Sequence, residues 1–164
     1  MNRITGMLVV ALALAVLQPA TSAENQCRKA VGSMVAVADA SSNSATGTLS
    51  HAGFLNGTTV AVFNSRPYTT PVPTQVTFTS TFALTTSHGQ LNGNATYLFD
   101  FATGQGTAIV KIDPAAGTGI FAEATGVLFI NLVKSDTVGT GPYHELIEAQ
   151  ICFAPGHEPP DEEE

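Results

Sequence analysis

The residues best suited to chemistry lie in the last strand-like segment, residues 143–153, which contains His144, Glu145 and Glu148. Side chains alternate between the two faces of a strand, so Glu145 shares a face with the apolar residues of this segment, whereas His144 and Glu148 point the other way. A carboxyl group on an apolar interior face has a raised pKa and can act as a general acid or base. Glu145 is therefore the better catalytic candidate, and a solvated position near the strand start is the alternative.

Three further residues are, like Glu145, weak catalytic candidates: Glu123, His51 and His144. Glu123 lies in a glycine-rich loop, where a carboxylate is usually solvated. We expect His51 and His144 to lie on strands, where they could face a cavity. The histidines are far apart and none has the spacing of paired metal ligands, so the sequence predicts no metal site. No motif for a cofactor is present either.

A glycine-rich segment, "GTGIFAEATGVLFINL" at residues 117–132, invites comparison with a nucleotide-binding loop. Such a loop needs a helix after it, but the apolar, β-branched run "VLFINLV" follows here and indicates a strand. We therefore expect Gly119 and Gly126 to supply a positive φ or a close backbone approach at a bend. The ring of Phe121 can then turn into the core.

The same segment resembles the Gly-x-Gly-x-Phe-x-x-Ala-Thr-Gly signature of the allene oxide cyclase and dirigent superfamily, which also includes many uncharacterised secreted bacterial proteins. The resemblance covers roughly residues 46–153, and a Glu stands at position 123 where Gly is frequent. The matching residues are Gly117, Gly119, Phe121, Ala124, Thr125 and Gly126.

This resemblance implies an eight-stranded antiparallel barrel with an apolar cavity, often assembled as a trimer. Members of the superfamily steer reactive intermediates without a cofactor, by cyclising a fatty-acid epoxide or by orienting phenoxy radicals. No catalytic residue of those proteins can be placed on this sequence, so the resemblance adds a fold and a class of activity but no site.

Strand patterns dominate the elements that must position these residues. The segment at 75–86 alternates apolar residues with threonines, and the segment at 91–101 places Tyr97, Phe99 and Phe101 on one face. The turn between them predicts a long hairpin. About eight such segments follow one another with regular turns, and "SSNSATG" at 41–47 is typical of a flexible linker. The sequence thus predicts an all-β barrel, with a β-sandwich as the alternative.

The ends of the chain have a different character. Residues 1–23 have the layout of a secretory signal peptide, with an apolar run too short to span a bilayer, which predicts a secreted or periplasmic protein with no stable membrane anchor. Residues 24–154 are predicted to form the barrel domain, and the acidic, proline-containing segment 155–164 is expected to be disordered. The net charge of −7 argues against nucleic acid as a partner.

The only two cysteines, Cys27 and Cys152, lie near opposite ends of the predicted mature chain. An exported protein meets an oxidising compartment, so an even pair predicts a disulfide that joins the N-terminal segment to the last strand. Two buried free thiols are the alternative.

Three functions remain open at this point. The leading hypothesis is a non-enzymatic barrel that binds a small apolar ligand or acts structurally, as a monomer or as a homo-oligomer. The second is a cofactor-free isomerase or cyclase that uses a barrel carboxylate. The third is a secreted interaction or adhesion module built on a sandwich. A cavity on the order of 300 Å³ or larger favours ligand binding, whereas an interior filled by side chains favours the structural role.

Overall fold

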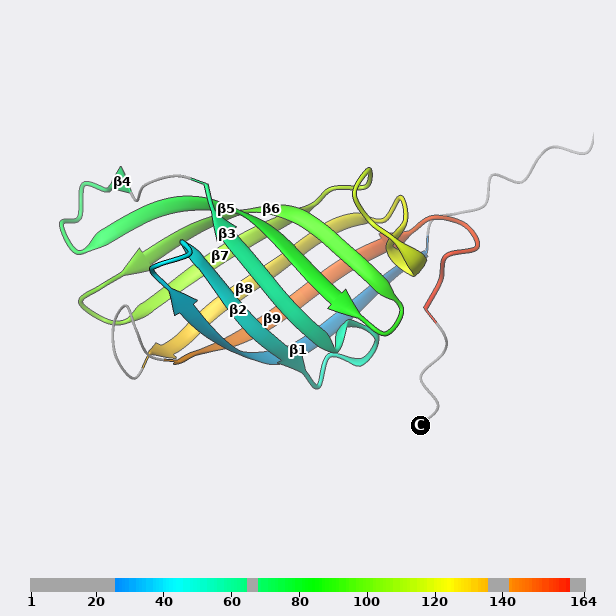
Figure 1. The fold of residues 1–164 in the computed structure, drawn as a ribbon, viewed down its shortest axis with the longest axis horizontal. Coiled ribbons are helices and arrows are strands. Elements are labelled where there is room, and N and C mark those ends of the chain that lie inside the picture. Colours follow the sequence, from blue (N-terminus) through cyan, green and yellow to red (C-terminus); the bar gives the residue numbers. More distant parts are fainter. Residues whose placement is uncertain (1–25, 65–67, 136–141, 160–164) are drawn as a thin grey trace, which may run out of the picture.

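The computed structural model describes residues 26–64, 68–135 and 142–159, and within them the chain forms an antiparallel barrel with almost no helix (Figure 1). Two single-turn 3₁₀ helices, η1 at Gly53–Leu55 and η2 at Gly119–Phe121, lie in the connections at one end. The strands are β1 (Gln26–Asp39), β2 (Ser44–Ser50), β3 (Gly57–Phe63), β4 (Tyr68–Thr69), β5 (Gln75–Thr86), β6 (Gly89–Asp100), β7 (Gln105–Ile112), β8 (Thr125–Ser135) and β9 (Pro142–Phe153).

Eight of these strands close the barrel. Their order is β3-β2-β1-β9-β8-β7-β6-β5, and β3 pairs with β5 from Gly57↔Thr86 to Phe63↔Ser80, which joins the two edges of the sheet. The two-residue strand β4 pairs with β5 beyond the end of β3, at Tyr68↔Thr77. The predicted eight-stranded antiparallel barrel is therefore confirmed, and the alternative of a β-sandwich is wrong.

The strands follow the alternation of the sequence. The predicted hairpin is β5 and β6, which pair along their whole length from Gln75↔Asp100 to Thr86↔Gly89. The expected linker at 41–47 is mostly strand, because β2 already begins at Ser44. The turn before it is held by Asp39, whose carboxylate accepts hydrogen bonds from the Ser41 amide (2.8 Å) and the Ser42 hydroxyl (2.7 Å). The Ser41 hydroxyl also donates to this carboxylate, at 2.6 Å, and together the Ser41 hydroxyl, the Ser42 hydroxyl and the Ser41 amide lower the pKa of Asp39 to about 2.

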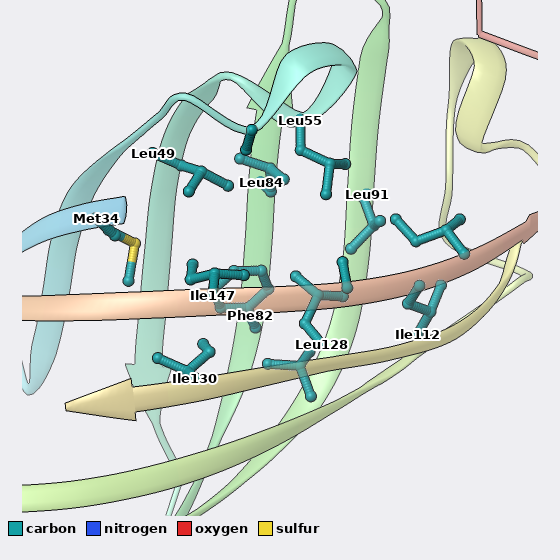
Figure 2. Close-up of a cluster of buried hydrophobic side chains, with 14 of the residues drawn as sticks. Met34, Leu49, Leu55, Phe82, Leu84, Leu91, Ile112, Leu128, Ile130 and Ile147 are labelled. Carbon is teal, nitrogen blue, oxygen red and sulfur yellow. The ribbon is translucent and has the colours of Figure 1, made fainter. Parts of the chain in front are cut away.

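One end of the barrel is filled by large apolar side chains. It is the end that carries η1, η2 and the disulfide, opposite the β1–β2 turn (Figure 1). In Figure 2 the side chains from facing strands point toward one another and meet in the barrel interior. Fully buried members of this cluster are Leu49, Leu55, Leu84, Leu91, Phe121, Leu128, Ile151 and Phe153. An eight-stranded barrel is just wide enough for such side chains to fill it, so this end is a packed core.

The glycine-rich segment belongs to this packed end. Gly119 has a φ of 61° and begins η2, and Gly126 has a φ of 141° at the start of β8. A Cβ at Gly126 would lie 2.1 Å from the Gln150 carbonyl oxygen of β9. Phe121 is completely buried. The interpretation as a bend that feeds a core strand is confirmed, because both glycines adopt a positive φ and strand β8 follows.

The predicted disulfide is confirmed. Cys27 and Cys152 are directly opposite each other on the paired strands β1 and β9, and their sulfur atoms are bonded across a sequence separation of 125 residues. The bridge therefore ties the first strand of the barrel to the last one at the packed end.

Both ends of the chain are only partly covered by the structure. The predicted signal peptide, residues 1–23, lies outside the described residues, as do residues 160–164 of the acidic segment. Before them, the His157 amide donates a hydrogen bond of 3.0 Å to the Ala154 carbonyl. None of the helices in the described ranges has the length and apolar character needed to cross a bilayer.

Gly126 offers a test of this packing. Substitution Gly126→Ala should lower the free energy of unfolding by about 3 kcal/mol, because the new Cβ would meet β9 backbone at a positive φ. Gly156→Ala is the matched control, since Gly156 also has a positive φ, of 80°, but has open space around it, and should cost about 1 kcal/mol. Urea unfolding measures both, and equal losses would contradict the close approach at β9.

The disulfide can be tested by the double variant Cys27→Ser/Cys152→Ser. Loss of a cross-link that spans 125 residues should reduce the free energy of unfolding by roughly 4–5 kcal/mol in the chain-entropy view. Chemical denaturation of both proteins under oxidising conditions measures the difference. Unchanged stability would show that the disulfide does not stabilise the fold by reducing the conformational entropy of the unfolded chain.

Candidate functional site: a hollow barrel end with a buried carboxyl group

The other half of the barrel encloses a cavity of about 240 Å³. Its lining includes Asn43 of the β1–β2 turn and Phe101 of the β6–β7 turn. Both turns lie on the left in Figure 1. Strands β1, β2 and β3 contribute small inward residues here, with Ala38, Ala45 and Ala61 in register across the three strands. One row deeper, Ala36 lies opposite Gly47. The hollow exists because these short side chains cannot fill the barrel width that the leucines fill at the packed end.

The opposite wall is aromatic. The rings of Phe78 and Tyr97 are stacked with centroids 4.7 Å apart and planes 7° apart, and Phe63 meets both of them edge-on. A second group joins Phe99 edge-on to Phe101 at 5.0 Å and to Tyr143 at 6.3 Å. Because each ring is fixed by contact with another ring, the wall is largely preorganised.

Among the described residues that line the cavity, Glu145 is the one with a carboxyl group. It points inward from β9 between its register partners Met34 on β1 and Leu132 on β8, and only 8% of its surface is exposed. Burial among apolar neighbours raises its pKa from 4.5 to about 7. No hydrogen bond or ion pair to this carboxyl group is present among the residues that the structure describes.

Two hydroxyl pairs accompany Glu145 inside the barrel. The Thr59 hydroxyl donates to the Met34 sulfur at 3.1 Å, and the Ser80 hydroxyl donates to the Tyr97 oxygen at 3.3 Å. Burial raises the pKa of Tyr97, the Ser80 hydrogen bond opposes this rise, and the nearby Glu145 carboxylate adds to it. Glu145 is therefore close enough to Tyr97 to act on it electrostatically.

The other catalytic candidates lie away from the cavity. His144 is exposed on the outer face of β9, and Glu123 is an exposed loop residue with a φ of 58°. His51 was expected on a strand, which is wrong: it follows the end of β2, is exposed and has a φ of 58°. A positive φ takes the chain out of the extended conformation, so these two loop residues cannot present side chains to the interior as a strand residue does.

Sequence reasoning missed the hydroxyl groups. Ser80 occupies an inward position of β5 between Phe78 and Phe82, and it breaks an otherwise apolar face. That interruption was the available signal. Alternation predicts the correct face of β6 for its partner Tyr97 but does not identify Tyr97 as a site residue. The hydrogen bond between Ser80 and Tyr97 depends on how closely the side chains of β5 and β6 approach, which the sequence pattern does not show.

The arrangement suits binding and proton transfer. A carboxyl group with a pKa near 7 can exchange a proton at neutral pH, and its negative form can hold a cation or a hydrogen-bond donor. Among the described residues, no three His, Cys, Asp or Glu side chains are grouped as metal ligands.

Comparisons with protein-family models, with curated proteins and with solved structures found no match for this chain. The cavity is therefore the feature of this chain that bears on its function.

The raised pKa of Glu145 predicts how stability depends on pH. Its carboxyl group stays protonated in the folded protein up to about pH 7, but only up to 4.5 in the unfolded chain. Unfolding therefore releases a proton in this window, and the free energy of unfolding falls by about 3 kcal/mol as the pH rises through it. Above pH 7 the penalty is constant.

Glu145→Gln should remove this contribution and should be more stable than the wild type above about pH 7. Urea unfolding between about pH 4.5 and pH 7 measures this contribution, as the difference in the free energy of unfolding between wild type and variant at each pH. Glu148→Gln, on the exposed face of the same strand, is the control and should leave the slope unchanged. If the free energy of unfolding depended on pH in the same way in wild type and in Glu145→Gln, the raised pKa of a buried Glu145 would be refuted.

Proposed function

We propose that this protein binds a small, largely apolar molecule in the hollow end of its barrel. The observation that carries the proposal is the contrast between the two ends: one is filled by leucines and phenylalanines, and the other leaves about 240 Å³ between alanines and aromatic rings. Ligand cavities are typically apolar with a few placed polar groups, which matches this lining.

The volume limits the ligand. Sites for drug-sized molecules occupy roughly 300–1,000 Å³. A cavity of about 240 Å³ lies just below the lower end of that range, so it suits a molecule smaller than a typical drug. A single ring with a short side chain suits this space, and the flat stacked pair of Phe78 and Tyr97 offers a matching surface.

A second candidate function is acid–base catalysis without a cofactor, as the resemblance to the allene oxide cyclase and dirigent superfamily suggests. The specific observation in its favour is Glu145, whose pKa of about 7 suits proton exchange at neutral pH and whose side chain lines the cavity. Binding is the better supported function, because it needs only the space and its lining, whereas catalysis also needs a second reacting group in a defined position.

The proposal places the protein outside the cytoplasm, in the secreted or periplasmic space. The disulfide and the signal-like residues 1–23 support this location. Self-association, for which the resemblance implies a trimer, has support from the apolar residues on the outer face of neighbouring strands. Exposed examples are Val31 and Val35 on β1, Leu146 on β9, Phe129 on β8 and Ile109 on β7.

The binding proposal is tested by filling the cavity. Ala61→Leu places a larger side chain into the hollow and should abolish binding of a neutral single-ring probe such as 2-phenylethanol, while the fold remains. Val60→Leu adjoins it on the outward face of β3 and is the matched control. Methyl NMR of the mature, oxidised protein provides the measurement.

In the wild type and in Val60→Leu, the probe should shift the signal of Ile130, which lines the cavity, and leave Ile112 at the packed end unchanged. In Ala61→Leu the Ile130 shift should disappear. A shift that survives the filling, or that appears equally at both isoleucines, would count against the cavity as the binding site. Conversion of the bound molecule, lost in Glu145→Gln, would favour catalysis instead.

A further inference from the structure

We propose that the ligand of this cavity is a small protonated amine with an apolar single-ring body, whose ammonium group pairs with the Glu145 carboxylate. This inference rests on the proposed binding function and adds the chemical class of the ligand. Among the described residues, Glu145 is the interior polar side chain without a partner. The inference follows from this unpaired group, from the charges of the lining and from its aromatic rings.

The interior contains three buried polar side chains in the described part of the chain: Thr59 (4% exposed), Ser80 (0%) and Glu145 (8%). Thr59 and Ser80 have partners in Met34 and Tyr97. Glu145 has none, although a carboxylate is the most costly of the three to bury unpaired. Every fully buried side-chain nitrogen and oxygen of the described residues has a hydrogen-bond partner. The unpaired Glu145 oxygens therefore border the cavity, where a ligand can reach them.

The charge of the lining selects the partner of Glu145. No Lys, Arg or His is among the described residues that line the cavity. An anionic ligand would meet a like charge with nothing to balance it, and an uncharged apolar ligand would leave the carboxylate unpaired. An ammonium group supplies both the opposite charge and several hydrogen-bond donors, so it satisfies Glu145 best.

The aromatic wall favours the same class. Ring faces carry a negative partial charge and attract cations within about 6 Å, most strongly where water is excluded. Phe78, Tyr97 and Phe63 form one fixed cluster in the lining, and Phe99 and Tyr143 belong to another. A cation that pairs with Glu145 therefore finds aromatic neighbours, and its apolar ring can pack against the remainder of the wall.

Protonation of Glu145 provides a second readout. Beside Glu145, the described lining contains two titratable side chains, the phenols of Tyr97 from β6 and Tyr143 from β9. The lining residues from β1, β2, β3, β5 and β8 have none. Phenols do not ionise near neutral pH as a class. A pH effect on amine binding in this range therefore reports Glu145, and burial that places its pKa at about 7 puts the effect near neutral pH.

The experiment compares three compounds of nearly equal shape on the mature protein with its disulfide intact: 2-phenylethylamine, 2-phenylethanol and phenylacetate. Affinities are measured by calorimetry and by the methyl signal of Ile130, in the wild type, in Glu145→Gln and in the outward-facing control Glu148→Gln. The amine should bind the wild type at least about tenfold more tightly than the alcohol at pH 8, and phenylacetate should bind most weakly.

Glu145→Gln should cancel the preference for the amine and leave the affinity for the alcohol within about threefold, whereas Glu148→Gln should change neither. In the wild type, affinity for the amine should rise on the order of 30-fold from about pH 5.5 to about pH 8, as Glu145 ionises. The pH dependence is measured on the wild type alone, so it tests the inference even if a variant folds poorly.

The possible results distinguish failure of the amine inference from failure of the proposed binding function. Equal affinities for amine and alcohol, a preference for phenylacetate, or amine binding that is independent of pH and of Glu145 would overturn the amine inference and leave the binding function standing. If none of the three compounds shifts Ile130 in the wild type, both proposals fail.

Discussion

Pairing of β3 with β5 is the constraint on which the rest of the structure depends. It joins the two edges of the sheet, so every second residue of eight strands must share one enclosed volume. In an open sheet, a change of side-chain size could be accommodated at the edges. In a closed barrel of fixed strand number the width is set by the backbone, and side-chain size alone decides whether the interior is filled or hollow. The cavity is thus a consequence of closure combined with small residues.

The two ends of the barrel use this constraint in opposite ways. Interdigitating leucines, the glycine-rich bend and the disulfide occur together at one end, whereas at the other end alanines face an aromatic wall across a hollow. Gly119 and Gly126 serve the packed end, where they allow the chain to approach the backbone of its neighbours closely. The glycine-rich segment therefore bears on the fold, and the cavity that bears on function lies at the opposite end.

Period-two alternation predicted much of this fold and part of the site. It placed the β5–β6 hairpin, and it put Glu145 on an apolar face, because inward and outward positions are encoded locally along a strand. The pairing of Ser80 with Tyr97 depends on the register between strands and on ring positions, which alternation does not encode. The prediction that His51 lies on a strand is wrong because His51 itself has a positive φ, so β2 ends one residue earlier. The conformation of a turn is not encoded by alternation along a strand. The volume of the hollow depends on closure, which no single segment determines.

Glu145 remains the residue that the fold alone does not explain. A pKa raised from 4.5 to about 7 corresponds to about 3 kcal/mol of lost stability above neutral pH, and an apolar side chain would avoid that loss. The disulfide, with roughly 4–5 kcal/mol, and the packed end can tolerate a penalty of this size. Thr59 and Ser80 show that the same interior provides partners for its other polar groups. A carboxyl group without such a partner, set against preorganised rings, is accounted for when the missing partner is a ligand.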